Sequence, residues 1–367
     1  MNQLLTLTDQ PFLKNIRERI LVCDGAMGTE IQRHNPSLED FAGLEGCNEI
    51  LCLTKPALIQ EIHASYLQAG ADIIETNTFG ASSVVLDEYQ QGSAAFEINL
   101  KAAALAKEVA NSFSTRELPR FVSGAIGPTT KLVSLGHISF DDLYAGYLVQ
   151  TEGLLRGGVD LLQIETCQDP LQIKAAVQAA NDAFLKVGRR VPIFVQITIE
   201  TVGTMLVGTD INAALTTIES LGVEGVGMNC ATGPDLMKEY IKYLGANSTR
   251  YISVLPNAGL PRNVGGRAVY DLTPEQLALA LLEFVNEFGV NMGIGFQLMD
   301  DLLDVYADMS KFGKTVGGDI IANKKTYLLI TALQKAKGAD AKKLNELLND
   351  RTIDSLSKVK EVTALYD

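Results

Sequence analysis

Asp24, Glu165 and Cys230 each stand at the end of a short apolar run in the first 291 residues of this 367-residue chain. Other polar or glycine-rich segments follow runs of the same kind, at 75–79, 127–129 and 256–259. If these runs are strands of one parallel barrel, their carboxyl ends meet at one face, where barrel enzymes carry their active sites. The placement predicts a shared polar mouth containing acids, amides and a thiol.

A different acidic pattern lies near residue 300. Asp300, Asp301 and Asp304 stand in the sequence DDLLD, and on a helix this spacing places three carboxylates one turn apart on a common face. Such carboxylates suit Mg²⁺ ions that bridge to a diphosphate. A solvated helix face is the alternative for a DDxxD pattern taken alone. The two groups of residues call for different chemistry.

The elements that must position the first group alternate along the chain. Apolar runs rich in β-branched residues lie at 20–23, 71–75, 121–125, 159–165, 191–198, 223–229 and 251–255. Helical patterns separate them, at 56–68, 94–113, 140–156, 171–185, 236–243 and from Thr273 onward. Near-continuous apolar strands are typical of a parallel sheet buried on both faces. The alternation predicts an α/β fold, a (β/α)₈ TIM-type barrel.

Charge divides the chain at the same place as the motifs. Residues 1–291 hold 20 Lys and Arg against 33 Asp and Glu, whereas residues 292–367 hold 11 of each, so the net charge of −13 belongs to the first part. We therefore expect two domains, 1–291 and 292–367, with the second all-helical. An acidic surface disfavours binding to nucleic acid.

Location and redox state follow from the same composition. No apolar run approaches the ~20 residues that span a bilayer, and the first residues lack the pattern of a secretory signal. An odd number of cysteines, five, indicates thiols rather than a disulfide framework. We expect a cytoplasmic protein that does not bind membranes.

Several motifs of the first part carry a family likeness. They read DGAMGT at 24–29, LTKP at 53–56, AGADIIETNTF at 69–79, GP at 127–128, GMNCATGP at 227–234 and PNAG at 256–259. Over about residues 15–291 the chain resembles the homocysteine-binding domain of cobalamin-dependent methionine synthase. The resemblance implies a homocysteine S-methyltransferase module of methionine biosynthesis, whose methyl donor, such as methylcobalamin, is carried on a separate module.

The resemblance also implies roles for particular residues. In this family Zn²⁺ binds the homocysteine sulfur and presents it as a thiolate to the methyl donor. Asp24 and Glu165 match the carboxylates that bind the homocysteine amino group, and Cys230 matches the first of three zinc cysteines. The alternatives are that Asp24 and Glu165 bond loop amides and that Cys230 is a small buried core residue.

The other two zinc cysteines of the family are missing. They form an adjacent pair in a Gly-Gly-Cys-Cys-Gly sequence that ends strand eight, and this chain reads MGIGF at 292–296 instead. We therefore expect an incomplete eighth strand, an incomplete zinc site and impaired methyl transfer. Cys167, near the predicted mouth, is the remaining candidate to join Cys230 at a metal.

The second part carries a different likeness. The segments GFQLMDDLLDVY at 295–306, KFGKTVGGDI at 311–320 and NKKT at 323–326 resemble the C-terminal portion of trans-polyprenyl diphosphate synthases. The resemblance implies magnesium at Asp300, Asp301 and Asp304, with Lys314 and Lys325 as diphosphate partners. The opposing aspartate-rich motif of that family is absent from residues 1–291. Amphipathic helices are expected beyond residue 337.

We interpret the chain as a chimera of the two families. Most of its length belongs to the barrel, which favours an impaired homocysteine S-methyltransferase. Two alternatives stay open: an isoprenoid (polyprenyl) diphosphate synthase fragment, and a non-catalytic barrel that binds an amino acid.

Overall fold

The computed structural model describes residues 10–260, 262–264, 267–285, 318–321, 326–350 and 353–366. The chain forms two compact units, Met1–Leu282 and Glu283–Asp367. The expected domain boundary after residue 291 and the expected eighth strand lie outside the described residues.

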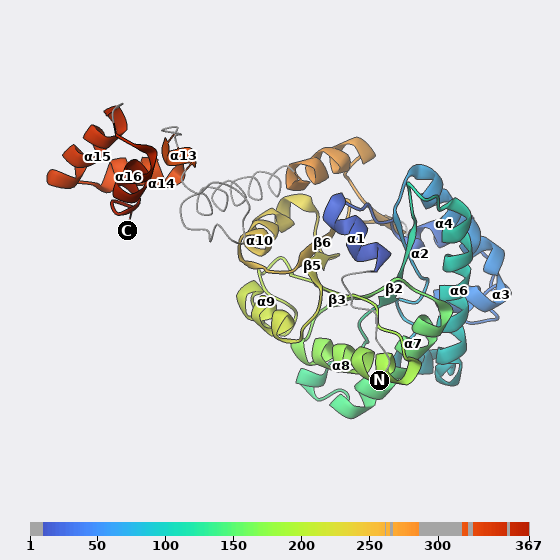
Figure 1. The fold of residues 1–367 in the computed structure, drawn as a ribbon. Helices are drawn as coiled ribbons and strands as arrows, with labels where there is room; N and C mark the ends of the chain where they lie inside the picture. The colour runs from blue at the N-terminus through green and yellow to red at the C-terminus, as the bar shows by residue number, and fades with distance from the viewer. Residues whose placement is uncertain are drawn as a thin grey trace. The chain divides into compact units, whose positions relative to one another are not determined.

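The first unit is built on a curled sheet of six parallel strands that pair in chain order (Figure 1). The strands are β1 Ile73–Glu75, β2 Phe121–Ile126, β3 Leu161–Cys167, β4 Ile193–Ile197, β5 Gly225–Asn229 and β6 Tyr251–Leu255. These are six of the seven strands expected from the sequence. The α/β architecture with consecutive parallel strands is consistent with a TIM-type barrel.

The first expected strand, 20–23, is reduced to a single parallel bridge between Cys23 and Ile73. The segment still follows β1, because the Val22 carbonyl accepts from Ile73 N at 3.1 Å and Asp24 N donates to the Ile73 carbonyl at 2.9 Å. Its outward side chains have little cover, since Ile20 is 61% exposed and Val22 57%. Few packing contacts on the outer face therefore support further strand pairing between this segment and β1.

Helices lie on the outside of the sheet (Figure 1). The longer ones are α4 Pro56–Ala69, α6 Ala95–Phe113, α7 Phe140–Gly157, α8 Pro170–Val187, α9 Ile211–Ser220 and α10 Pro234–Asn247. All except α9 match helical patterns expected from the sequence. Shorter helices are α1 Pro11–Glu18, α2 Met27–His34, α3 Leu51–Thr54 and α5 Ser83–Leu86, and the single-turn segments are Asn48–Ile50, Asp87–Tyr89, Gly92–Ala94 and Val133–Leu135.

Local sequence explains where these helices begin and end. The Ser139 hydroxyl accepts from Asp142 N at 3.1 Å and caps the start of α7, which ends at Gly158 in the left-handed conformation.

After β6 come a hairpin of β7 Arg262–Val264 with β8 Arg267–Val269, and then a helix over 274–285. Thr273 and Gln276 form a reciprocal capping box at its start, as expected from their sequence.

An acidic residue stands immediately before every second strand: Asp72 before β1, Asp160 before β3 and Glu224 before β5. Each is joined to one residue of the preceding strand segment by two reciprocal bonds. Asp160 N donates to the Val122 carbonyl at 2.7 Å, and Val122 N donates to the Asp160 carboxylate at 2.8 Å. Asp72 makes the same pair with Val22, and Glu224 makes it with Ile193. The repeated pair fixes the register of neighbouring strands.

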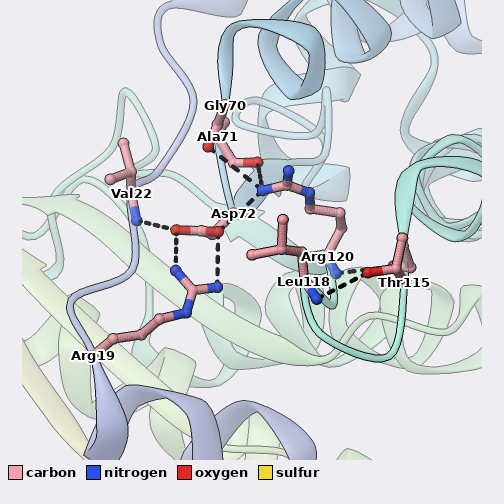
Figure 2. Close-up of polar contacts among 9 residues, drawn as sticks. Arg19, Val22, Gly70, Ala71, Asp72, Thr115, Leu118 and Arg120 are labelled. Atoms are coloured by element: carbon pink, nitrogen blue, oxygen red, sulfur yellow. Dashed lines mark hydrogen bonds and ion pairs between the residues drawn. The ribbon is translucent and has the colours of Figure 1, made fainter.

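Basic side chains neutralise these acids. Figure 2 shows Arg19 and Arg120 converging on Asp72, where Arg19 donates twice, at 2.8 and 2.9 Å, and Arg120 once at 3.0 Å. Burial of Asp72 opposes its ionisation, but the hydrogen bonds from Arg19 and Val22 outweigh it and hold the pKa of Asp72 below its usual value. Lys107 pairs with Asp160, and Arg190 with Glu224.

An apolar layer fills the interior at the end where the strands begin. It contains Phe12, Leu13, Ile73, Phe121, Leu161 and Phe194. Phe12 of α1 meets the rings of Phe121 and Phe194 edge to face, with centroids 5.4 and 5.7 Å apart. Helix α1 therefore closes this end of the sheet, and any opening to a ligand must lie at the other end.

The second unit is helical in its described parts. Its helices are α13 Gly318–Ile321, α14 Tyr327–Lys335, α15 Ala339–Asn349 and α16 Ser355–Thr363. A small apolar core joins them through Ile320, Leu329, Leu344, Leu347 and Val362. The expectation of a helical C-terminal segment is confirmed.

The Asp72 cluster generates a stability prediction. Asp72→Asn removes the charge that two arginines share, one of which, Arg120, has a side chain only 12% exposed. Because breaking a buried pair leaves an uncompensated charge, we expect the free energy of unfolding to fall by about 3 kcal/mol in urea denaturation at pH 7. The loss should shrink as the pH falls below 3.8, the usual pKa of the carboxyl, because the ionised Asp72 stabilises only above that range.

Two further variants calibrate this result. Asp160→Asn should cost less, about 1 kcal/mol, because the side chains of Asp160 and Lys107 are 21% and 28% exposed. Glu117→Gln changes an exposed acid in a loop and should have no measurable effect. Equal losses for all three variants would contradict the proposed role of Asp72.

Candidate active site

Three carboxylates gather at the carboxyl ends of the strands. Asp24 follows the segment beside β1, Glu75 is the last residue of β1, and Glu165 lies near the end of β3. Glu75 N donates to one Asp24 oxygen at 3.0 Å, and the Gln163 side-chain amide donates to Glu75. Gln163 and Glu165 alternate with Ile164 on β3, so both point to the interior face. The expected mouth therefore holds Asp24 and Glu165 together, with Glu75 between their strands.

Burial raises the pKa of each of these acids, and repulsion between carboxylates adds to the shift for Asp24 and Glu165. For Asp24 burial acts first and the negative charge of Glu75 second. Burial raises the pKa of Glu75 to about 7. Burial raises the pKa of Glu165, and the charges of Glu75 and Asp24 add to the shift. No described basic side chain bonds to any of the three. A cation entering the mouth would relieve the repulsion.

Asn229 connects Glu165 to Cys230. Its side-chain amide donates to Glu165 Oε2 at 2.9 Å and to Thr166 Oγ1 at 2.8 Å, and lies 3.5 Å from Cys230 Sγ. Its own oxygen accepts from Thr166 N at 2.8 Å. One side chain at the end of β5 thus fixes the acid, the neighbouring loop and the thiol, which makes Asn229 a positioning residue.

The loops around Cys230 are strained. Thr166, Cys230 and Ala231 have φ values of 54°, 55° and 55°, in the left-handed region that side chains other than glycine seldom occupy. Each such residue costs of order 1 kcal/mol and persists only where neighbouring bonds impose it. Cys230 N donates to the Leu255 carbonyl at 3.2 Å, and Thr166 N is held by Asn229. The strain coincides with the predicted mouth.

The five cysteines of the chain all lie among the described residues and all are free. Cys230 is partly exposed, and burial raises the pKa of its thiol although a hydrogen bond from Thr166 opposes the shift. Cys167 is buried, and its sulfur lies 3.8 Å from the carbonyls of Ile164 and Glu165 in its own strand. The cysteines therefore provide no second thiol bonded to Cys230 within the described part of the chain.

A zinc site of the expected kind does not fit these residues. In the described ranges, no three His, Cys, Asp or Glu side chains are grouped so that they could hold a metal ion. Since a zinc site open to substrate needs three protein ligands, Cys230 alone is insufficient. Asp300, Asp301, Asp304, Lys314 and Lys325, the candidates for magnesium and diphosphate, lie outside the described residues.

Comparisons with known proteins identify the family of the chain. Residues 21–295 match the family model of homocysteine S-methyltransferase. The chain belongs to the homocysteine S-methyltransferase family. Residues 275–366 match the model of polyprenyl synthetase, so the two matches overlap at 275–295. Both resemblances found in the sequence are confirmed.

The relatives of the chain include methionine synthases, and solved structures of a methyltransferase share its fold. Methionine synthases of Mycobacterium tuberculosis and Mycobacterium leprae are each 44% identical, over 78% and 77% of this chain. The chain spans only 24% of the length of either relative. Two structures of the homocysteine methyltransferase MmuM of Escherichia coli share the fold. The oxidized form has a TM-score of 0.61 at 20% identity, covering 76% of this chain and 92% of that one, and the metallated form 0.57 at 21%, covering 68% and 88%.

The sequence placed Glu75 at the predicted mouth, within segment 75–79, and Asn229 in the motif GMNCATGP, but it gave neither residue a role in the site. The position of Glu75 two residues after the inward Ile73 is the signal that could have grouped it with Asp24 and Glu165. Asn77 shapes a loop by donating to the Asn48 carbonyl at 2.8 Å. No helix among the described segments is long and apolar enough to cross a membrane.

The raised pKa of Glu75 predicts a cost to folding. At pH above its usual value of 4.5, the unfolded chain loses the proton that the folded protein still holds, so this group lowers stability as the pH rises from 4.5 to about 7. Glu75→Gln keeps an oxygen that accepts from Gln163 but has no carboxyl group to ionise. The substitution therefore removes this loss of stability at high pH. We expect the variant to be about 2 kcal/mol more stable than wild type at pH 8, since one pKa unit corresponds to ~1.4 kcal/mol.

The measurement is urea denaturation of both proteins at pH 5 and pH 8. The advantage of Glu75→Gln should be smaller at pH 5, where the wild-type acid is protonated in the folded protein. Glu117→Gln, at an exposed site, should show no such dependence. A destabilised Glu75→Gln protein at pH 8 would show that Glu75 is ionised and favourably bonded.

Proposed function

We propose that the first unit is a homocysteine-binding module of the methionine synthase type, which holds the amino group of L-homocysteine between Asp24 and Glu165. One observation carries the proposal: buried carboxylates converge at the strand ends without a basic partner among the described residues. An ammonium group supplies the missing charge and several hydrogen-bond donors. The family membership indicates which ammonium compound is bound.

The contacts of the two acids support this role. Asp24 Oδ2 accepts from Glu75 N, whereas Asp24 Oδ1 is buried and has no partner. Asn229 orients Glu165 from the other side of the mouth. Because Asn229 also contacts Cys230, the amino-group site and the thiol are neighbours. The substrate sulfur would lie toward Cys230, the residue that matches a zinc ligand of the family.

We propose further that methyl transfer is impaired. In the family, zinc supplies the acidity that converts the homocysteine thiol to a thiolate. Cys230 is the one residue here that matches this ligand set, and no cysteine follows it in the chain. Binding of the homocysteine amino group needs only the carboxylates. The chain could therefore bind homocysteine without converting its thiol to a thiolate. A methyl donor such as methylcobalamin would come from a separate module.

The fold proposal is a (β/α)₈ barrel with an incomplete eighth strand, formed by residues 1–291 and followed by a helical segment at 292–367. Exposure at both ends of the sheet supports it. All residues of β6 are partly exposed, whereas all residues of β2, β4 and β5 are buried. Ile20 and Val22, at the opposite end of the strand order, are also exposed.

A second candidate function rests on the match of residues 275–366 to polyprenyl synthetase. In that interpretation Asp300, Asp301 and Asp304 would bind magnesium, and Lys314 and Lys325 a diphosphate. In the described part of the second unit, one apolar cluster joins Ile320, Leu329, Leu344, Leu347 and Val362. We favour the barrel as the functional unit, either as an impaired enzyme or as an amino-acid-binding protein without catalysis.

Binding of L-homocysteine tests the amino-group site directly. By isothermal titration calorimetry we expect Asp24→Asn and Glu165→Gln to weaken binding about 10- to 100-fold, because a hydrogen bond to a charged group contributes ~1.5–3 kcal/mol. Glu117→Gln should bind as wild type does. A ligand without the amino group, 4-mercaptobutyrate, should not bind. Unchanged affinity in both site variants would disprove the assignment.

Metal content tests the proposed impairment. Purified protein should hold less than one zinc per chain by elemental analysis and should not methylate homocysteine from methylcobalamin. A version whose residues 292–296 are replaced by Gly-Gly-Cys-Cys-Gly should gain zinc. Adding Cys230→Ala to that version should reverse the gain, because three thiolates are needed. Stoichiometric zinc with methyl transfer in the original chain would refute the impairment.

A further inference from the structure

Glu75 lies in a polar layer of the barrel interior between the apolar layer and the mouth. Ile73 belongs to the apolar layer, and Glu75 is the next inward residue of β1. Gln163 stands in the same relation to Leu161 on β3, and Gln196 to Phe194 on β4. Ser123 pairs with Glu75 in the register of β1 and β2. The layer is therefore polar on four neighbouring strands.

Within the described residues, several polar atoms of Asp24 and of this layer are buried and have no hydrogen-bond partner. They are Asp24 Oδ1, Ser123 Oγ and Gln196 Oε1. Ser123 is 1% exposed and Gln196 is fully buried, so these groups are shielded from solvent. Unpaired buried acceptors are costly, and their grouping is typical of a site that receives a hydrogen-bond donor. This observation is independent of the charges of the acids.

The titratable groups that face Glu75 are Cys23, Asp24, Glu165 and Cys230. None of them can be positively charged, and the facing residues of β2, β4 and β6 are the neutral Ser123, Gln196 and Ser253. Three carboxylates in one interior cannot all ionise without a counter-charge. One proton retained by the group is the simplest way to lower that repulsion.

We propose that Glu75 is a third carboxylate of the amino-group site and releases its proton to solvent when a cationic amino group binds between Asp24 and Glu165. This inference rests on the proposed function. The exchange balances: the O–H bond of the Glu75 carboxyl breaks, the proton leaves to buffer, and the ligand ammonium supplies the positive charge that the carboxylate then faces. Glu75 acts on the ligand through Asp24, whose carboxylate its peptide N–H already holds.

The expected result is a pH-dependent affinity for L-homocysteine. Because the pKa of Glu75 is about 7, about half of the free protein carries the proton at pH 7, and its release on binding should raise the affinity about tenfold between pH 6 and pH 8. Glu75→Gln should reduce that rise to less than about twofold.

Calorimetry in two buffers at pH 7, phosphate and Tris, measures the released proton, because these buffers differ in their heat of ionisation. Wild type should release about half a proton more per ligand than Glu75→Gln. Release from the ligand thiol contributes to both proteins and cancels in the comparison. Glu49→Gln is the matched control, since burial also raises the pKa of Glu49 but its carboxylate bonds Gly80 N outside the cluster; it should behave as wild type.

The outcomes distinguish the inference about Glu75 from the proposed function. Equal proton release and equal pH dependence in wild type and Glu75→Gln, with binding intact, would overturn the inference alone. Failure of wild type to bind L-homocysteine at any pH would overturn the proposed function and this inference with it. A merely structural role for Glu75 would change affinity by a similar factor at every pH, which also contradicts the inference.

Discussion

The reciprocal pair between an acid and a residue of the preceding strand segment sets the register on which the first unit depends. It recurs before β1, β3 and β5, where Asp72, Asp160 and Glu224 each exchange two hydrogen bonds with one neighbouring residue. Parallel strands have no hairpin to fix their alignment, so a side chain that accepts a specific N–H supplies that information. Because side chains alternate along a strand, this register also decides which residues reach the mouth.

Buried carboxyl groups have opposite electrostatic environments at the two ends of the strands. Asp72, before β1, is paired with two arginines, and its pKa is held below the usual value. Glu75, three residues later, has no basic partner in the described structure, and burial raises its pKa to about 7. Charges at the start of the strands are neutralised within the protein and support folding. Those at the strand ends remain uncompensated, as expected of a site that awaits a cationic ligand.

The strained loops also distinguish the two ends of the strands, because they lie at the mouth. The backbone is left-handed at Thr166, Cys230 and Ala231, where Thr166 N donates to the Asn229 side chain and Cys230 N donates to the Leu255 carbonyl. These residues lie where β3 and β5 end, beside the acids, and not where the strands begin. The apolar layer and the reciprocal hydrogen-bonded pairs stabilise the end where the strands begin. This stability offsets the backbone strain of the left-handed residues at the opposite end. The methyltransferase family match covers both faces, whereas the polyprenyl synthetase match begins only at residue 275.

The sequence by itself determined the family, six of the strands, the main helices and the grouping of Asp24, Glu165 and Cys230 at one face. Those features depend on the periodic spacing of apolar residues and on short motifs. Both can be identified from residues that are close together in the sequence. It also shows that no cysteine follows Cys230. Helix α9 was not recognised.

Only the tertiary structure decided that 20–23 keeps a single bridge, that Glu75 joins the other two acids and that Asn229 links Glu165 to Cys230. It also showed that the Cys167 sulfur bonds carbonyls of its own strand. The bridge of Cys23, the position of Glu75 and the link from Asn229 to Glu165 depend on contacts between residues 50 or more positions apart, and the state of Cys167 depends on its burial. A carboxylate has the same letter in the sequence whether an arginine or another acid faces it, and only the fold chooses its neighbour.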